Sequence, residues 1–540
     1  MTDLDLRRLH AITDRLIAGH DRRDSPGVSV GLVRDGALVL HRSAGMASIE
    51  LGVPVGPDTV FRIASVSKQF TCAAILMLAA EGKLSVDDPV QKYFPDMADY
   101  EAPITLDHLM HNNSGIRDML QCMAMGGSDL AMPIKLSDLR DSIVRQRTLN
   151  FIPGSRYLYS NSNFFLLGLI AEQVSGMKLA DFLAARIFAP LGMNRTAMVE
   201  STTAIVAGLA TGYLPDGAGF RRAQHGYPIH GEGALVSSVV DLALWHRNDE
   251  TGLVGGAGLR EALEAQSTFP TGVTNHYARG LTISDVRGLR TVSHGGLWPG
   301  YVTEFLRIPA LATAIVVISN NGATVPYRIG QTLLAALVEG LPKIHPLPTR
   351  PDHLAAYVGR FIDPVAPQTI DFTLGPDGDL FGNQFGVPGP LKPMPDGRMA
   401  AARSAPDFTC RLIEDGAAIE VEEDAGIIRR WERVQDDAPL PADLDGTYFS
   451  DEMAATWVIT GASVRVDGPV VRGVTWELEP LAADLVRMLV PGTLMRSWMD
   501  AKLVRDAAGR VTGLLVNGGR VKRLTLVRSG PSGIRSTDAV

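Results

Sequence analysis

A serine and a lysine three positions apart are the first residues whose types and spacing could do chemistry. In the stretch FRIASVSKQFTCAAILMLA, which begins at Phe61, Ser65 ends a short apolar run, and a long apolar helix is predicted to follow at once. Lys68 then lies one turn further on, on the same side of that helix. An amine that apolar packing keeps out of water could accept the serine proton, and N–H groups at the helix start favour developing negative charge.

The same four-letter pattern occurs a second time, so its context has to decide which copy matters. Ser175 precedes Lys178 by three positions, but it follows an apolar helical stretch and stands directly before Gly176. It therefore ends a helix, and no buried helix follows that could hold the amine. We predict that Ser65 is a nucleophile and that Ser175 is not, with an ordinary helix start as the alternative for Ser65.

Two further motifs could supply partners for a hydroxyl nucleophile. Tyr159 and Asn161 form a Tyr-x-Asn just ahead of an apolar helix, and His294 and Gly296 form a His-x-Gly on a late strand that runs into glycines. A phenol can pass a proton between the serine and a leaving group, and an amide can hold a substrate carbonyl and the Lys68 amine together. Taken alone, the first motif fits a helix-capping loop equally well, and a single histidine is usually structural.

The three motifs, in this order and at these separations, resemble those of the penicillin-recognising serine hydrolases. That group includes class C β-lactamases, D-Ala-D-Ala carboxypeptidases, related esterases and D-stereospecific aminopeptidases. The phrases ITLDHLMHNNSGIRD, PGSRYLYSNSNF, IFAPLGMNRTAM and GEGALVSSVVDLALW are similar to the group as well. The resemblance implies an α+β fold of the β-lactamase/DD-peptidase type, in which an antiparallel sheet is flanked by a helical region, and it implies catalysis without a cofactor or a metal.

The resemblance also implies a role for each motif residue. Ser65 would be the acylated nucleophile, and Lys68 and Tyr159 would be the general base and proton shuttle. Asn161 would orient the substrate amide. The oxyanion hole would be formed by the backbone N–H groups of Ser65 and Leu297.

His294 stands where other members of the group carry a lysine in a Lys-Thr-Gly motif. A permanent ammonium group suits the carboxylate of a β-lactam or of a peptide C-terminus, whereas a mostly neutral imidazole binds it less well. The exchange argues against carboxypeptidase and β-lactamase activity. It favours amides, esters, or short peptides with a free N-terminus as substrates.

The composition changes after the first 340 residues or so. PKIHPLPTRPD contains four prolines and is typical of a semi-rigid linker, and short alternating runs with Gly and Asp turns follow it. Two tail segments begin alike, which aligns Gly359 with Gly446. We predict two small antiparallel β-barrel domains, and the whole chain resembles the three-domain D-aminopeptidases. The predicted domains are 1–341, 342–440 and 441–540.

An aminopeptidase has to hold the ammonium group of its substrate, and two acids are candidates. Glu232, in HGEGALVSS, stands at a position where D-aminopeptidases resemble this chain in having an acidic residue. Asp500, in MRSWMDA, resembles part of a loop through which the last barrel of those enzymes reaches the active site. The alternative for each is a solvated surface acid. This chain departs from the family pattern in two places: the loop after Asp500 is shorter than the resemblance predicts, and Thr282 stands at a position where the family has an amide.

Composition excludes several other classes of function. A net charge of −8 without any Lys/Arg block argues against a nucleic-acid partner, and the longest apolar runs are half the length of a membrane span. Three widely spaced cysteines indicate neither a disulfide framework nor a zinc site, so we expect a cytoplasmic protein. The leading hypothesis is a D-aminopeptidase, with an esterase or a β-lactamase-like hydrolase as the alternative, then a non-catalytic muropeptide sensor. The resemblance leaves a homodimer open.

Overall fold

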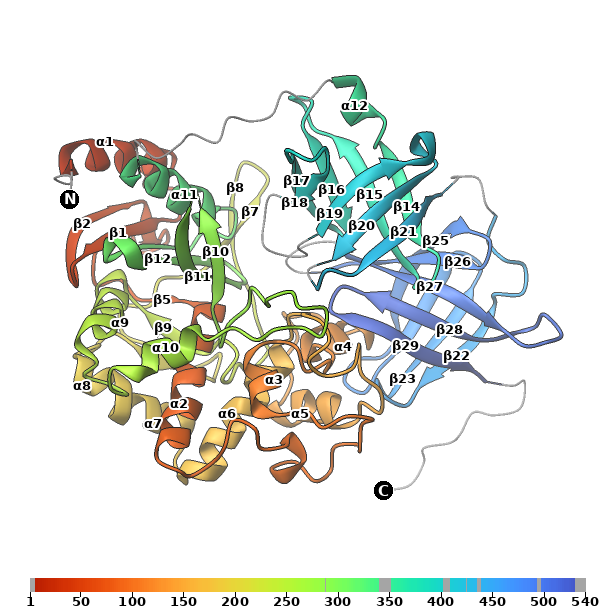
Figure 1. Cartoon of the computed structure of the whole chain (residues 1–540), viewed down its shortest axis with the longest axis horizontal. Helices are drawn as coiled ribbons and strands as arrows, with labels where there is room; N and C mark the ends of the chain where they lie inside the picture. The colour runs from red at the N-terminus through yellow and green to blue at the C-terminus, as the bar shows by residue number, and fades with distance from the viewer. Residues whose placement is uncertain are drawn as a thin grey trace.

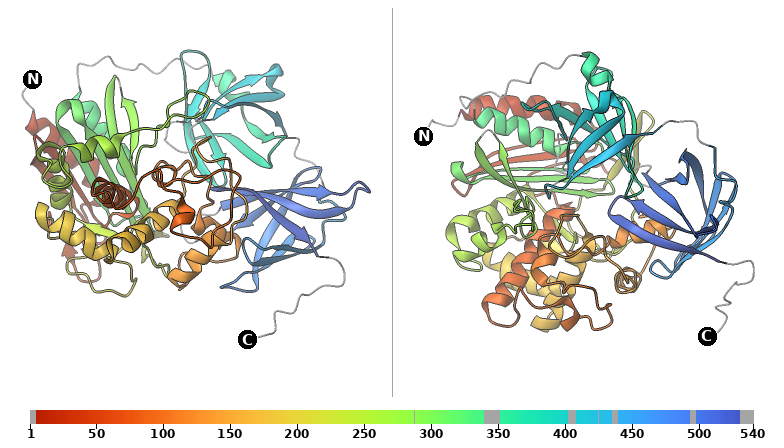
Figure 2. Two further views of the ribbon diagram at one scale, coloured as in Figure 1. Left: turned by 60° about the horizontal axis from the view of Figure 1, so that its bottom comes forward. Right: turned by 45° about the vertical axis from the view of Figure 1, so that its right-hand side comes forward.

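The computed structural model places an α+β domain beside two β-barrels (Figures 1 and 2). It describes residues 5–286, 288–338, 351–401, 408–423, 425–434, 439–492 and 497–529. The predicted fold class is confirmed: an antiparallel sheet with a helical region, followed by two closed barrels. Within the described residues, no helix is both long and apolar enough to cross a membrane.

Strands from both ends of the first domain form one six-stranded antiparallel sheet in the order β10-β11-β12-β13-β1-β2. Its strands are β1 (Val28–Arg34), β2 (Ala37–Ala44), β10 (Thr282–Val286), β11 (Leu289–Trp298), β12 (Tyr301–Ile308) and β13 (Thr313–Ser319). Asp35 and Gly36 join β1 to β2 with positive φ angles of 48° and 70°, as a two-residue turn matched to strand twist requires. An Asp-Gly pair between two alternating apolar runs predicts a hairpin from the sequence, and the structure has one there.

Helices cover both faces of the sheet. On one face α1 (Leu6–Ile17) packs with α11 (Pro326–Leu337) over the apolar side chains of β1 and β13, as Figure 1 shows. On the other face lie α9 (Val239–Thr251) and the helical region. The sheet is thus buried on both sides, which explains the continuous apolar run of β13.

Two almost entirely buried helices form the centre of the helical region, α2 (Lys68–Ala80) and α6 (Asn161–Ser175). Because neighbours surround them, apolar residues occupy every side of each helix rather than one stripe. Gly176, with φ of 71°, ends α6 in a left-handed cap, so Ser175 closes a helix as predicted. The remaining helices are α3 (Leu106–Met110), α4 (Met119–Met125), α5 (Leu136–Val144), α7 (Leu179–Leu183), α8 (Ala189–Leu191) and α10 (Gly258–Glu264).

Short strands connect these helices and complete the first domain. They are β3 (Met46–Ser48), β4 (Val53–Pro54), β5 (Phe61–Arg62), β6 (Ala197–Met198), β7 (Tyr213–Asp216), β8 (Gly219–Arg222) and β9 (Leu235–Ser237). The β5 strand pairs with β9, which fixes the chain immediately before the predicted nucleophile.

The tail forms two closed barrels of eight antiparallel strands each. Gly359 is the first residue of the first barrel and Gly446 is the first residue of the second, in line with their alignment in the sequence. The predicted boundary at 341/342 lies outside the described residues, and all three domain ranges stay predictions. The short helix α12 (Pro351–Ala355) precedes the first barrel.

The strands of the first barrel are β14 (Gly359–Asp363), β15 (Gln368–Leu374), β16 (Leu380–Gln384), β17 (Val387–Pro393), β18 (Met399–Ala401), β19 (Phe408–Ile413), β20 (Ala418–Glu423) and β21 (Ile428–Arg433). Those of the second are β22 (Gly446–Ser450), β23 (Ala455–Thr460), β24 (Ser463–Asp467), β25 (Val474–Ala482), β26 (Leu485–Val490), β27 (Ser497–Arg505), β28 (Val511–Gly518) and β29 (Val521–Arg528). Inward side chains such as Trp431 and Trp457 fill the interiors, so each barrel has a packed core.

A buried ion pair joins the two barrels. Asp500 on β27 is 0% exposed; one carboxylate oxygen accepts a hydrogen bond from Arg487 Nε at 2.9 Å, and the other accepts from Thr369 N at 3.2 Å and Thr369 Oγ1 at 2.6 Å. Arg487 also donates to Asp371 of the first barrel at 2.8 Å. The pair itself lies within the second barrel, and each of its members also bonds a residue of the first barrel, Thr369 for Asp500 and Asp371 for Arg487.

We predict that Asp500→Asn destabilises the barrels by about 3 kcal/mol, because removing one partner of a buried pair leaves the other charge poorly compensated. Urea unfolding followed by tryptophan fluorescence measures the effect. Asp377→Asn, in an exposed turn of the first barrel, is the matched control and should unfold like the unmodified chain. Equal stability of the two variants would contradict the assignment.

Candidate active site

The predicted nucleophile lies in a tight turn against the sheet. Ser65 belongs to the short helix η2 (Ala64–Ser67) and is partly exposed, and Ala64 before it has a φ of 48°, a left-handed value that is strained for alanine. Gly296 on β11 approaches so closely that a Cβ atom there would lie 2.3 Å from the Ile63 carbonyl oxygen. A glycine at 296 is thus needed for the strand to lie beside the serine.

Lys68 has three hydrogen-bond partners and is 0% exposed. Its Nζ lies 3.1 Å from Ser65 Oγ, 2.9 Å from Asn161 Oδ1 and 2.6 Å from the main-chain oxygen of Glu232. The last two oxygens can only accept, so each takes one N–H of the amine. Once the amine has given up a proton, its remaining N–H groups can stay on these two acceptors while its lone pair faces the Ser65 hydroxyl, an arrangement suited to taking the serine proton.

Asp118 fixes the orientation of the Asn161 amide. One carboxylate oxygen accepts hydrogen bonds from Asn161 N at 2.7 Å and from Asn161 Nδ2 at 2.8 Å, which leaves the amide oxygen facing Lys68. The other oxygen of Asp118 accepts from Gln121 N and caps α4. Asp118 lies within ITLDHLMHNNSGIRD, but the sequence gives no sign of its role, because its partner Asn161 is 43 positions away.

Two cationic side chains lie against the ring of Tyr159. Lys68 Nζ is 4.9 Å from the ring centroid, and the guanidinium carbon of Arg520 is 4.5 Å from it. Arg520 belongs to the last barrel, so the second barrel contributes a charge to the site. Both contacts are attractive because a ring face carries negative electrostatic potential.

His294 on β11 is held in its neutral form. Its Nδ1 lies 2.6 Å from the Gly295 carbonyl oxygen, which can only accept, so Nδ1 carries the proton and Nε2 accepts from the Tyr277 hydroxyl at 2.8 Å. Burial, with the Lys68 charge nearby, lowers the pKa of His294 to about 3, although the Gly295 carbonyl opposes the shift. A permanent cation is therefore absent from position 294, as the His-x-Gly motif led us to expect.

The remaining predicted residues are placed differently from one another. Glu232 contributes its main-chain oxygen to Lys68, but its carboxylate turns back to accept the His230 N–H at 3.1 Å, and burial raises its pKa. Leu297 follows Gly296 on β11 with its side chain 48% exposed. Asp500 is not brought to this site; its carboxylate is buried between the barrels, and this position does not support the expected contact with a substrate amine.

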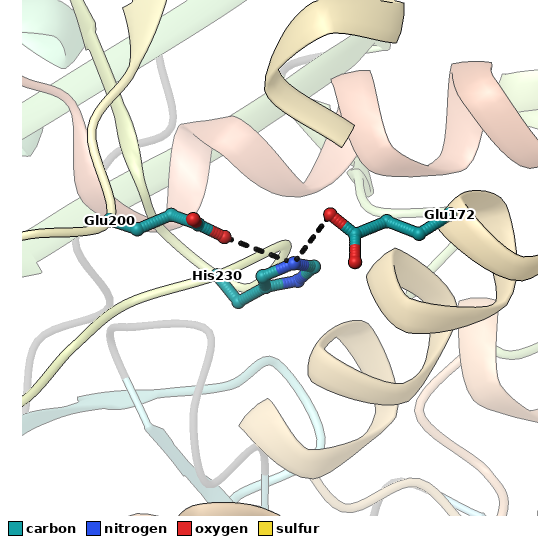
Figure 3. Close-up of side chains that lie close together, drawn as sticks. All are labelled: Glu172, Glu200 and His230. Atoms are coloured by element: carbon teal, nitrogen blue, oxygen red, sulfur yellow. Dashed lines mark ion pairs between the residues drawn. The ribbon is translucent and has the colours of Figure 1, made fainter. Parts of the chain in front are cut away.

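A second charged cluster supports the segment that carries Glu232. His230 Nε2 lies 3.1 Å from Glu200 and 3.6 Å from Glu172 of α6, as Figure 3 shows. Burial would raise the pKa of Glu172, but hydrogen bonds from His230 and the Leu179 N–H lower it to about 2. The sequence analysis expected no metal, and these three side chains are spaced so that they could hold one. Their direct ion pairs nevertheless account for the cluster without an ion.

The chain belongs to the Beta-lactamase family, because the family's sequence pattern matches residues 13–339. This family assignment makes the protein a hydrolase, and it agrees with the fold and with the motifs that meet at Ser65. The predicted roles of the individual site residues are not tested by it.

Several relatives of this chain bear the name D-aminopeptidase, including two that match almost all of it and one that matches 63% of it. One from Cereibacter sphaeroides is 28% identical over 93% of this chain and 96% of its own length. One from Brucella anthropi is 28% identical over 91% of this chain and 93% of its own length. One from Gluconobacter oxydans is 31% identical over 63% of this chain and 64% of its own length.

Solved structures share the fold. An octameric penicillin-binding protein homologue from Pyrococcus abyssi is 25% identical with a TM-score of 0.57, over 79% of this chain and 100% of its own. A D-amino acid amidase from Ochrobactrum anthropi SV3, solved with D-phenylalanine, is 22% identical with a TM-score of 0.52, over 62% of this chain and 99% of its own.

The buried neutral histidines predict how stability depends on pH. Burial lowers the pKa of His294 to about 3 and those of His225 and His276 to about 4, whereas a histidine in an unfolded chain titrates near 6.5. Below about pH 6.5 the unfolded chain therefore binds more protons than the folded chain, so this contribution to stability is complete above that pH and is lost as the pH falls toward 4. Each such site contributes at most about 1.4 kcal/mol per pH unit.

Urea midpoints measured from about pH 7.5 to about pH 4.5 check this prediction. His294→Gln should flatten the dependence, whereas His353→Gln, at an exposed position on α12, should keep the unmodified slope. Identical slopes for both variants would show that His294 is charged in the folded chain.

Proposed function

We propose that this protein is a D-aminopeptidase that releases N-terminal D-amino acids from amides, esters and short peptides through an acyl-enzyme on Ser65. The observation that carries the proposal is the contact of Lys68 Nζ with Ser65 Oγ at 3.1 Å, with the other amine donors bound to Asn161 and to the Glu232 carbonyl. After the amine loses a proton, its two N–H groups can stay on Asn161 and the Glu232 carbonyl. Its lone pair is then available to the Ser65 hydroxyl.

The reaction begins when Lys68 takes the Ser65 proton and the serine oxygen attacks the substrate carbonyl. The electron pair of the carbonyl moves to its oxygen, which the N–H groups of Ser65 and Leu297 stabilise. As the intermediate collapses, the C–N or C–O bond breaks, and Tyr159 passes the proton to the leaving group. Water then attacks the ester, its proton returns through the same groups, and Ser65 is freed.

Two observations support an amide or peptide substrate with a free amine. The relatives that match almost the whole chain are named D-aminopeptidases. In addition, neutral His294 lacks the charge that would select a carboxylate at that position. Glu232 lies in the segment whose main-chain oxygen binds Lys68. We propose that its carboxylate holds the substrate ammonium.

An esterase with the same machinery is the second candidate. The position of Asp500 favours it, because one of the two acids expected to bind an ammonium is committed to Arg487 and Thr369 instead. Glu232→Gln separates the two candidates. It should raise KM for D-alanine p-nitroanilide by about tenfold, through loss of a charged contact, and leave p-nitrophenyl acetate within about twofold; equal effects on both substrates contradict the ammonium role.

Ser65→Ala should abolish covalent labelling by a fluorophosphonate and reduce hydrolysis of D-alanine p-nitroanilide by at least about a thousandfold, since the acyl-enzyme cannot form. Intact-mass spectrometry measures the adduct, and absorbance measures turnover. Ser175→Ala, at the half-buried last residue of α6, is the matched control and should behave like the unmodified enzyme.

Comparison of D- and L-alanine p-nitroanilide tests the stereochemistry. We expect the D isomer to be preferred. Equal rates for both isomers would sink the stereospecific assignment, and an enzyme that labels at Ser65 but hydrolyses only esters would establish the second candidate.

A further inference from the structure

A hairpin of the last barrel is anchored in the catalytic domain. The β28–β29 turn carries Arg520, and Asn150 binds the main chain on either side of Val521, where β29 begins: its side-chain nitrogen donates to the Arg520 carbonyl at 3.1 Å, and its oxygen accepts from Lys522 N at 2.7 Å. The fully buried Arg117 donates to the main-chain oxygens of Lys522, at 3.2 Å, and Arg523, at 3.4 Å. The β29 side of the turn is thus held by two side chains of the catalytic domain.

This anchoring delivers the Arg520 side chain to the catalytic residues. Its guanidinium carbon is 4.5 Å from the centre of the Tyr159 ring, and its nearest nitrogen is 3.5 Å from Asp118 Oδ2, beyond the distance of a good hydrogen bond. Asp118 is 1% exposed and already accepts the two donors of Asn161, whereas the Arg520 side chain is 44% exposed. The guanidinium is therefore partly open to solvent beside Tyr159, and its contact with Asp118 does not fully engage its donors.

Arg520 differs from the two other basic side chains near Ser65. His294 is neutral, and Lys68 is enclosed by three acceptors. Arg520 is a permanently charged group with the planar pair of donors that suits a carboxylate. It is also on the side of Tyr159, which passes the proton to the leaving group in the proposed reaction.

We infer that Arg520 binds a carboxylate on the leaving group, so that this enzyme prefers short peptides whose residue after the scissile bond has a free C-terminus. In such a substrate the α-carboxylate is two bonds from the leaving nitrogen that Tyr159 protonates. The last barrel thereby supplies the cation that is absent at position 294. The inference rests on the proposed function for the direction of the leaving group.

A purely structural role for Arg520 has a different signature. If the guanidinium only balances the charge of Asp118, its loss disturbs Asn161 and slows every substrate alike. If it reads a carboxylate, its loss affects only substrates that carry one, and it acts mainly through KM because the contact exists before the bond breaks.

The test compares D-Ala-Gly with D-Ala-Gly amide, which differ only in the terminal carboxylate. The unmodified enzyme should favour the free acid, and Arg520→Gln should lower kcat/KM for the acid by about tenfold or more while changing the amide and D-alanine p-nitroanilide by less than about twofold. Arg520→Lys should fall between the two, because it keeps the charge and loses the paired donors. Arg523→Gln, exposed on the same hairpin, is the matched control.

Two results would overturn the inference: an equal loss on acid and amide, which assigns Arg520 to positioning Asp118, or no loss on either. If no D-aminoacyl substrate is hydrolysed, the proposed function fails separately. Acetate esters of 4-nitrophenol and 3-carboxy-4-nitrophenol then give the same comparison, since only the second leaving group carries a carboxylate. Loss of a preference for the carboxylated ester in Arg520→Gln sustains the role, and absence of any preference or any turnover overturns it.

Discussion

The site depends on keeping one lysine side chain out of water while satisfying it completely. Lys68 is buried, and each of its neighbours is imposed by a different part of the chain: Ser65 by the preceding turn, Asn161 by α6, and Glu232 by the segment before β9. An unpaired amine at this depth would be costly, so the three acceptors are required for stability as well as for chemistry. Lys68 begins α2 and Asn161 begins α6, so the packing of these two buried helices sets the distance between the amine and the amide.

Charged residues that bind the neighbours of Lys68, and not Lys68 itself, keep its acceptors in place. Asp118 holds the nitrogen of Asn161 and so directs its oxygen to the lysine. His230, paired with Glu172 and Glu200, holds the segment that ends in the Glu232 carbonyl. Orientation is thus enforced by charges that do not touch Ser65.

The last barrel is part of the active site through its anchored hairpin. Its apolar core also takes in Cys122 and Met125 of α4, and Trp457 of the barrel donates to the Met125 carbonyl, so the barrel packs directly on the catalytic domain. What it adds is Arg520 beside Tyr159, together with the main-chain carbonyls that satisfy the buried Arg117. The buried pair of Asp500 and Arg487 has a different role, because its contact with Thr369 links the last barrel to the first barrel.

The sequence by itself determined the class of fold and the local setting of the motifs. Hydrophobic periodicity predicted the hairpin at Asp35 and the buried helix after Ser65, and it placed Ser175 at a helix end, because these features depend on neighbours in the chain. The resemblance of the motifs predicted the two barrels that the structure shows.

Only the tertiary structure decided which distant charges meet. Asp500 was expected near the substrate and lies between the barrels, whereas Arg520 had no assigned role and lies against Tyr159. Asp118 reaches Asn161 across 43 positions of chain. Ion pairs and cation–ring contacts between separate domains leave no periodic pattern in the sequence, because they arise from how completed surfaces dock.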